Sequence, residues 1–218
     1  MKESFKHIAD QLRCPSSSAG LEMGERMNQS NGRLISQTIE LLNVEEGDSI
    51  LEIGHGNGSH VADLFEKTSK ITYKGLDISP LMNGEAQKRN QELIRQNKVD
   101  FQLYDGEQIP MEIGLFTKIF SVNTLYFIQQ AEDFLAALSK LSADSCHLII
   151  SFVYKSFMEK RPFQEHGFRL YGEQEIRELV AKSSFKIKEI IKGMDTVASN
   201  LGEKLDRPYL IVNLYKHN

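Results

Sequence analysis

Three glycines at alternating positions, Gly54, Gly56 and Gly58, could build a ligand site. They lie in the stretch SILEIGHGNGSH, residues 49–60, which starts as a buried strand and ends as a polar helix start. Glycines in such a turn give unusual backbone dihedrals and let a ligand approach the main chain closely. The following helix offers free N–H donors. Glu52 adds a carboxylate beside the same turn. The stretch therefore predicts a small-ligand site.

The glycine spacing disfavours two common phosphate-binding sites. The nicotinamide fingerprint G-x-G-x-x-G would place its third glycine at position 59, where this chain has Ser59. The phosphate loop G-x-x-x-x-G-K-[ST] fails because no lysine follows at the required place. Glu52 would also repel a pyrophosphate of the same charge. The ligand is therefore expected to lack a pyrophosphate.

Strand and helix patterns alternate along the chain around this turn. This alternation predicts parallel strands joined by crossovers, with helices on both faces of the sheet. Expected strands cover 49–54, 71–77, 99–104, 117–122 and 146–153, and expected helices cover 60–68, 79–97, 131–141 and 172–184. The last two apolar segments, 185–193 and 207–216, have no convincing helix between them and are expected to pair antiparallel. The predicted fold class is α/β: a Rossmann-like, doubly wound, mostly parallel seven-stranded sheet with an antiparallel terminal hairpin.

The first 45 residues precede the first strand and form a different region. A short amphipathic helix is followed by the serine- and glycine-containing stretch CPSSSAGLEMG, expected to break the helix, and by a longer helix over 26–43. We expect residues 1–45 to form an N-terminal helical lid and residues 46–218 to form the ligand-binding domain.

Composition and charge narrow the class of protein. The 218 residues, 40% hydrophobic and 26% charged, are typical of one soluble globular domain. The net charge of −4 and the absence of a dense Lys/Arg stripe argue against a nucleic acid partner. Cys14 and Cys146 lie far apart and support neither a disulfide framework nor a metal site. No apolar run is long enough to span a membrane, and we expect a cytoplasmic protein.

The E-x-G-x-G-x-G arrangement resembles the first motif of class I S-adenosylmethionine-dependent methyltransferases. Similar segments follow the next three expected strands, so the resemblance covers roughly residues 49–153. It is strongest to the small-molecule subgroup that includes quinone and sterol methylating enzymes. The resemblance implies S-adenosyl-L-methionine as cofactor and S-adenosyl-L-homocysteine as product. This cofactor has no phosphates and carries a positive ammonium and sulfonium, which makes a carboxylate at Glu52 tolerable or useful.

The resemblance also assigns roles to residues at successive strand ends. In YKGLDISP, Asp77 would accept hydrogen bonds from the ribose hydroxyls. In YDGEQIPM, Asp105 would bind the adenine amine, with Gly106 and Glu107 at the ring edge. In FSVNTLYFI, Asn123 and Thr124 would lie under the methionine moiety. The predicted cofactor-binding residues are Glu52, Gly54, His55, Gly56, Gly58, Asp77, Ile78, Asp105, Gly106, Glu107 and Asn123.

Signals for the acceptor site are weaker. Candidate substrate residues are Met27, Asn28, Asn31, Tyr126, His166 and Tyr171, although ordinary packing explains each of them equally well. The phenylalanines at 152, 157, 163 and 168 are expected either to form an apolar acceptor wall or to anchor a long loop. His60 is expected at the surface, in a first helical turn. The sequence identifies no catalytic base.

These features predict methyl transfer by in-line displacement to a small-molecule acceptor that is at least partly apolar. The chain has NTLY where amino-directed nucleic acid methylation would show [DN]-P-P-[YF], and this absence, with the acidic charge, favours a small molecule. Three alternatives stay open: a non-catalytic S-adenosylmethionine-binding protein, a protein methyltransferase and, disfavoured by the glycine spacing, a nicotinamide-dependent reductase. The sequence predicts neither the acceptor's identity nor an oligomeric state.

Overall fold

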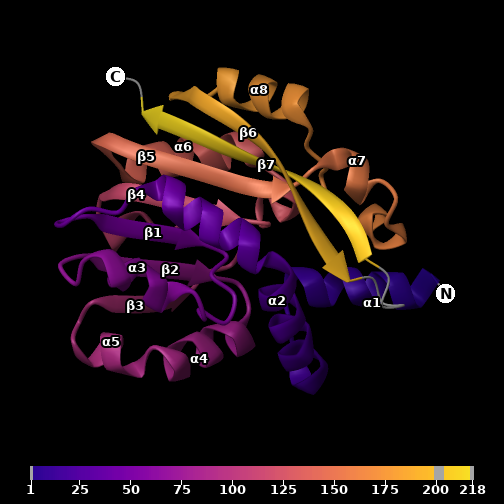
Figure 1. Ribbon diagram of the computed structural model, residues 1–218, viewed down its shortest axis with the longest axis horizontal. Helices are drawn as coiled ribbons and strands as arrows, with labels where there is room; N and C mark the ends of the chain where they lie inside the picture. The colour runs from indigo at the N-terminus through magenta and orange to yellow at the C-terminus, as the bar shows by residue number, and fades with distance from the viewer. Residues whose placement is uncertain (1, 199–203, 217–218) are drawn as a thin grey trace.

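A seven-stranded sheet forms the centre of the protein (Figure 1). The computed structural model describes residues 2–198 and 204–216. The strand order is β3-β2-β1-β4-β5-β7-β6, with β1 to β5 parallel and β7 antiparallel to both of its neighbours. The strands are β1 (Ser49–Ile53), β2 (Thr72–Asp77), β3 (Val99–Leu103), β4 (Phe116–Val122), β5 (Ser142–Val153), β6 (Phe185–Ala198) and β7 (Lys204–Lys216). The predicted sheet and its terminal hairpin are confirmed.

Helices cover both faces of this sheet (Figure 1). They are α1 (Lys2–Arg13), α2 (Ser17–Leu42), α3 (Val61–Lys67), α4 (Pro80–Arg89), α5 (Gln91–Arg95), α6 (Ala131–Leu141), α7 (Lys155–Met158) and α8 (Glu173–Ala181), with short 3₁₀ turns η1 (Met111–Ile113), η2 (Leu125–Phe127) and η3 (Pro162–Glu165). Within the described ranges, none of these helices has the length and apolar character needed to cross a membrane.

Two apolar cores, one on each face, hold the helices to the sheet. Successive side chains of a strand point to opposite faces, so one strand supplies both cores. In β1, Leu51 and Ile53 pack with α6 and α8, while Ile50 packs with α2 and α3. Because both faces are covered, the inner strands read as continuous apolar runs.

Two expectations about helix boundaries were wrong. The stretch CPSSSAGLEMG is mostly helical, because α2 already begins at Ser17. Its glycines serve close packing instead of a break: a Cβ at Gly24 would lie 2.8 Å from Met82 Sδ. The single helix expected over 79–97 is divided into α4 and α5 at Asn90, whose side-chain amide donates to the carbonyls of Gly58 and Ala86.

The long helix α2 joins the sheet to the region beyond its carboxyl edge (Figure 1). Its second half is part of the core, with Leu34 and Leu42 fully buried and Thr38 Oγ1 hydrogen-bonded to Ser151 Oγ at 2.6 Å. Its first half passes the carboxyl ends of the strands and lines a cavity there. The lid role expected for residues 1–45 stays a prediction. From Leu34 onward, this region is part of the core.

The strand order creates a switch point between β1 and β4. From β1 the chain proceeds outward to β2 and β3, then returns to β4 on the other side of β1. In open α/β sheets, ligands bind beyond the carboxyl ends of the strands at such a reversal. The loops after β1 and β4 are therefore expected to form a ligand site.

Candidate functional site

A cavity of about 250 Å³ opens at this switch point. Its walls come from α1, α2 and the segments that follow β1, β2, β3, β4 and β5. Small-molecule sites usually measure roughly 300–1,000 Å³, so this cavity is slightly smaller than that range. Its position and composition make it the candidate functional site.

The three motif glycines are required by their backbone conformation and differ in what surrounds them. All have positive φ, at +83° for Gly54, +57° for Gly56 and +63° for Gly58, a region that favours glycine. A Cβ at Gly54 would overlap the side chain of Thr124, and one at Gly58 would lie 2.9 Å from Ala86 Cβ. A Cβ at Gly56 would meet no atom within 4 Å. Gly54 and Gly58 therefore allow the loop to pack, whereas Gly56 leaves open space at the cavity wall.

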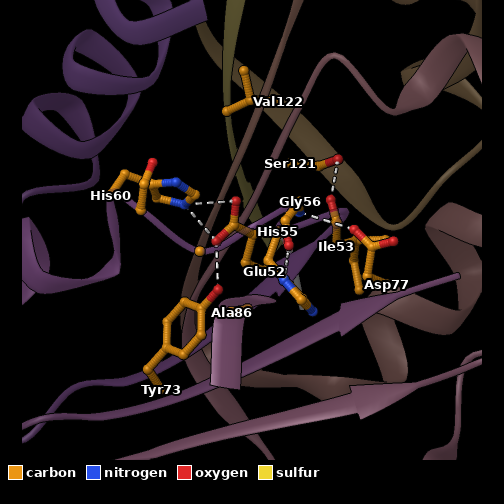
Figure 2. Close-up of polar contacts among 12 residues, drawn as sticks. Glu52, Ile53, His55, Gly56, His60, Tyr73, Asp77, Ala86, Ser121 and Val122 are labelled. Atoms are coloured by element: carbon orange, nitrogen blue, oxygen red, sulfur yellow. Dashed lines mark hydrogen bonds and ion pairs between the residues drawn. The ribbon is translucent and has the colours of Figure 1, made fainter. Parts of the chain in front are cut away.

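Asp77, at the end of β2, points its carboxylate at the same loop (Figure 2). Its Oδ2 accepts the N–H of Gly56 at 2.9 Å, and its Oδ1 accepts the N–H of Ser79 at 2.8 Å. Burial raises the pKa of this carboxyl above its usual value, and the two amide hydrogen bonds partly offset the rise. Each oxygen retains a further lone pair. Asp77 and the adjacent Ile78 both line the cavity.

Glu52 lies in a buried polar cluster beneath the loop (Figure 2). His60 Nε2 donates to both carboxylate oxygens, at 2.8 and 3.0 Å, and the Tyr73 hydroxyl donates to Oε2 at 2.5 Å. With 1% of Glu52 exposed, its charge needs these donors. Direct contact of Glu52 with a cofactor stays a prediction, and the observed geometry gives it a role in holding the loop.

The expectation that His60 lies at the surface was wrong. Only 8% of His60 is exposed, because its ring turns inward to the Glu52 carboxylate. Burial disfavours the charged imidazolium, but the adjacent carboxylate outweighs this effect and holds the pKa of His60 above its usual value. Burial beside the same carboxylate raises the pKa of Tyr73. The strand register brings the cluster together, and the local sequence of the helix start gave no sign of it.

Gly75 on β2 makes room for this cluster, and the sequence reading missed it. A Cβ there would lie 2.7 Å from His55 Cδ2 and 2.9 Å from the Tyr73 hydroxyl. The His55 ring packs on Phe101 with centroids 4.8 Å apart, and its Nδ1 donates to the Gly56 carbonyl at 2.7 Å. Its Nε2 is buried and has no partner within the described residues. His55 thus supports the glycine loop from below.

The loop after β3 forms the next part of the site. Gly106 lines the cavity at φ +84°, and a Cβ there would lie 3.0 Å from Ile78 Cγ2. Asp105 Oδ1 accepts the N–H groups of Gln108 and Glu107, each at 2.8 Å, which holds the pKa of Asp105 below its usual value. Asp105 and Glu107 are exposed and lie outside the cavity lining. Their contact with adenine stays a prediction.

Asn123, directly after β4, adopts a left-handed conformation with φ +55°. Its N–H donates to Ser151 O at 2.8 Å, and its Oδ1 accepts the N–H of Val153 at 3.1 Å. A non-glycine residue held in this region costs on the order of 1–3 kcal/mol and is often found at a functional site. Asn123 and Thr124 both line the cavity.

Four of the six substrate candidates line the cavity, namely Met27, Asn28, Asn31 and Tyr126. Asn28 Nδ2 donates to Asn57 Oδ1 at 2.6 Å and so ties α2 to the glycine loop. The other two candidates, His166 and Tyr171, lie outside the lining. Tyr171 is buried against Phe152, with ring centroids 6.0 Å apart.

The phenylalanines divide between wall and core. Phe157, Phe163 and Phe168 line the cavity, whereas Phe152 is fully buried within β5. The sequence reading missed Phe127 in the wall and also the three arginines of the lining, Arg13, Arg161 and Arg207. These residues come from segments far apart in sequence, and no local motif marks them.

Comparison with known sequences points to one family. Residues 50–144 match the family model described as a methyltransferase domain. YrhH of Bacillus subtilis, itself a provisionally assigned methyltransferase, is 30% identical over 105 residues, which are 47% of this chain and 54% of YrhH. The chain spans about half the length of the curated relatives it matches.

Solved structures share the fold over most of the chain. An S-adenosylmethionine-dependent methyltransferase from Aquifex aeolicus superposes with a TM-score of 0.65 at 17% identity, covering 97% of this chain and 98% of that one. The [4+2]-cyclase SpnF superposes with a TM-score of 0.67 at 16% identity, covering 86% and 82%. Taken together, residues 50–144 are similar to a methyltransferase domain, and the fold of the whole chain is shared with a solved S-adenosylmethionine-dependent methyltransferase.

Proposed function

We propose that this protein is a cytoplasmic enzyme that transfers a methyl group from S-adenosylmethionine to a small-molecule acceptor in the cavity. One observation carries the proposal. The Asp77 carboxylate accepts hydrogen bonds from the amides of Gly56 and Ser79 and faces the cavity. At Gly56, the cavity wall has no side chain and leaves open space. A vicinal pair of ribose hydroxyls needs such an acceptor pair.

The charges of the site fit this cofactor better than a dinucleotide. Glu52 and Asp77 are the two carboxylates in the described part of the lining, and both lie at the glycine-loop end. Glu52 is paired with His60, so the carboxylate of Asp77 would repel a pyrophosphate and attract an ammonium or a sulfonium. Asp77 would hold the ribose, the loop at Gly56 would lie along the amino-acid moiety, and the backbone at Gly106 would contact adenine.

The proposed catalysis depends on alignment of the two reactants. When bound, S-adenosylmethionine supplies an electrophilic methyl group on a sulfonium. The protein's part is to orient the acceptor in line with that methyl group and to exclude water, which accounts for much of the acceleration in such reactions. Asn123 and Tyr126 line the cavity after β4, and we propose that they contact the acceptor beside the cofactor.

The acceptor half offers no visible base. In the described lining after β4 and β5 there is no Asp, Glu or His side chain. A base is needed only when the acceptor must lose a proton before or during transfer. The lining therefore favours an acceptor whose nucleophile is already ionised or needs no deprotonation.

A non-catalytic or differently acting protein is the second candidate. This chain shares its fold with the [4+2]-cyclase SpnF, and one fold can host unrelated reactions. This likeness supports the second candidate. Such a protein would bind S-adenosylmethionine or its demethylated product and transfer no methyl group.

Isotope transfer distinguishes the two candidates. The full-length protein is incubated with methyl-labelled S-adenosylmethionine and a deproteinised small-molecule extract, in parallel with Asp77→Ala. We expect label in a low-molecular-weight product that the variant does not form. Cofactor binding without any labelled product would support the non-catalytic candidate. Label found only in added protein or nucleic acid would contradict a small-molecule acceptor.

A further inference from the structure

Three arginines line the cavity, and one of them already has an acidic partner. Arg207 Nε and Nη2 donate to the two oxygens of Asp195 at 3.0 and 2.7 Å, and this pair is buried. The same guanidinium donates to Ser30 O at 2.7 Å and to Asn31 Oδ1 at 3.1 Å. Arg207 therefore ties the terminal hairpin to α2, and its charge is compensated.

Arg13 belongs to the cofactor end of the cavity. It ends α1, and the next residue, Cys14, donates its S–H to the Ile78 carbonyl at 3.8 Å. Burial raises the pKa of Tyr104, which follows β3, and the charge of Arg13 is close enough to oppose that rise. Arg13 thus lies over the ends of β2 and β3, where an adenosine would bind.

Arg161 belongs to the opposite end, in the segment after β5. Its guanidinium carbon lies 4.2 Å from the centroid of the Phe157 ring. Its Nε is buried and has no hydrogen-bond partner within the described residues, and none of their carboxylates lies within ion-pair distance of it. A partly desolvated cation without a counter-ion is unfavourable, and so a bound anion would stabilise it.

Besides Phe157, which contacts Arg161, the same part of the lining holds a cluster of aromatic rings. Phe168 is packed against three rings, with centroid distances of 4.7 Å to Phe127, 5.3 Å to Tyr126 and 5.6 Å to Phe163. All four rings line the cavity. Among the described residues of this lining, Arg207 is paired with Asp195 whereas Arg161 has no acidic partner, and α1 packs beside η3.

We propose that the acceptor is an apolar molecule bearing one anionic group, and that Arg161 binds this group while the aromatic wall holds the apolar body. This inference rests on the proposed function, because it takes the half of the cavity after β4 and β5 as the acceptor site. A guanidinium stacked on a ring presents its N–H fork edgewise, which matches the paired oxygens of a carboxylate or sulfonate.

Two dyes that differ in one anionic group test this directly. The probes are 8-anilino-1-naphthalenesulfonate and N-phenyl-1-naphthylamine, which share the aromatic frame and differ in the sulfonate. Each is titrated by fluorescence into full-length protein saturated with S-adenosylhomocysteine, for wild type, Arg161→Gln, Arg161→Lys and Arg169→Gln. Arg169 is a matched control, because it lies on the same segment, is exposed and does not line the cavity.

We expect Arg161→Gln to weaken binding of the sulfonate dye by about tenfold or more, as for loss of a hydrogen bond to a charged group. Binding of the neutral dye should change by no more than about twofold on the same reasoning. Arg161→Lys should give an intermediate loss for the sulfonate dye, because it keeps the charge and removes the fork. Arg169→Gln should match wild type with both dyes.

Equal effects of Arg161→Gln on both dyes, or none on either, would overturn the inference. Calorimetry with S-adenosylhomocysteine tests whether Arg161 instead binds the carboxylate of the cofactor. Its affinity should be unchanged in Arg161→Gln, and a loss of about tenfold would assign Arg161 to the cofactor carboxylate and overturn the proposal. If wild type does not bind S-adenosylhomocysteine at all, the proposed function itself fails. The calorimetric titration is therefore done before the dye titrations.

Discussion

The two halves of the cavity are built in opposite ways. Most of the cofactor half comes from residues 52–106, on three adjacent parallel strands, with Arg13 of α1 beside them. Its inner carboxylates, Glu52 and Asp77, are buried and hydrogen-bonded. The acceptor half comes from α2, the segments after β4 and β5, and β7. Its largest continuous feature is a set of four aromatic rings in contact, and its polar groups, such as Asn31 and Arg161, are spread among apolar side chains.

This difference suggests how the two halves divide the work. Hydrogen bonds fix positions of individual atoms, so the cofactor half is suited to one ligand. Apolar contacts are less directional, so the acceptor half can change its ligand through a few substitutions without disturbing the loop. Variants of the two halves should therefore fail in different ways.

Removing His60 should have the largest effect on stability. His60→Ala leaves the buried Glu52 carboxylate without its cationic donor, and breaking a buried pair by removing one partner costs about 3–5 kcal/mol. Urea unfolding followed by circular dichroism measures this. His7→Ala, at an exposed histidine of α1, is the control and should match wild type. A loss below about 1 kcal/mol, the value typical of exposed pairs, would show that the cluster does not hold the cofactor half together.

Adding a methyl group at Gly56 should separate binding from stability. Gly56→Ala places a Cβ in open space, so only the positive φ resists it, at about 1–2 kcal/mol. If the cofactor lies there, the affinity for S-adenosylhomocysteine should fall by about tenfold or more.

Gly47→Ala provides the matched control for this substitution. Gly47 also has positive φ, at +92°, meets no atom within 4 Å and does not line the cavity. It should lose similar stability and keep full affinity. Equal affinities of the two variants would remove Gly56 from the cofactor site.

The His60–Glu52 pair should make stability depend on pH, with a smaller effect than His60→Ala because only its charge-dependent part titrates. The folded-state pKa of His60 is raised above the ordinary value of 6.5. The contribution is therefore complete below pH 6.5 and is lost as pH rises through the folded-state pKa. The difference in unfolding free energy between wild type and His60→Gln should shrink from pH 6 to pH 9. A constant or growing difference would contradict a charged pair.

The smallest effect is expected at the link between the halves. Asn28→Ala removes the hydrogen bond from α2 to Asn57 in the glycine loop, worth about 0.5–1.5 kcal/mol. We expect S-adenosylhomocysteine to dissociate a few-fold faster in stopped-flow measurements. Glu22→Gln, at an exposed position of α2, should leave the rate unchanged. A rate equal to wild type in Asn28→Ala would mean that the first half of α2 does not restrain the cofactor.

The sequence predicted the position of the glycine loop and of Asp77 at one edge of the sheet, because those signals are local, whereas their contact with a cofactor stays a prediction. The glycines follow their strand directly, and Asp77 ends the next one, so alternation alone brings them to one edge. What was missed depends on pairing across strands. The β1–β2 register sets Glu52 opposite Gly75, and the buried Glu52 carboxylate is the reason that His60 faces inward.

The acceptor half could not be predicted in this way. Arg161 and Arg207 meet the cavity from segments far apart in the chain, and each alone reads as a solvated surface charge. Tyr171 gave a misleading signal because it follows the same loop as the wall yet turns into the core beside Phe152. Tertiary packing decides such side chains.

Calorimetric titration of S-adenosylhomocysteine into wild type and Asp77→Ala tests the central claim most directly. Asp100→Ala, at an exposed aspartate of β3, is the control for the loss of a carboxylate. We predict micromolar binding by wild type and by the control, and its collapse in Asp77→Ala while the variant stays folded. No binding by folded wild type, or equal binding by Asp77→Ala, would contradict a cofactor anchored at the switch point.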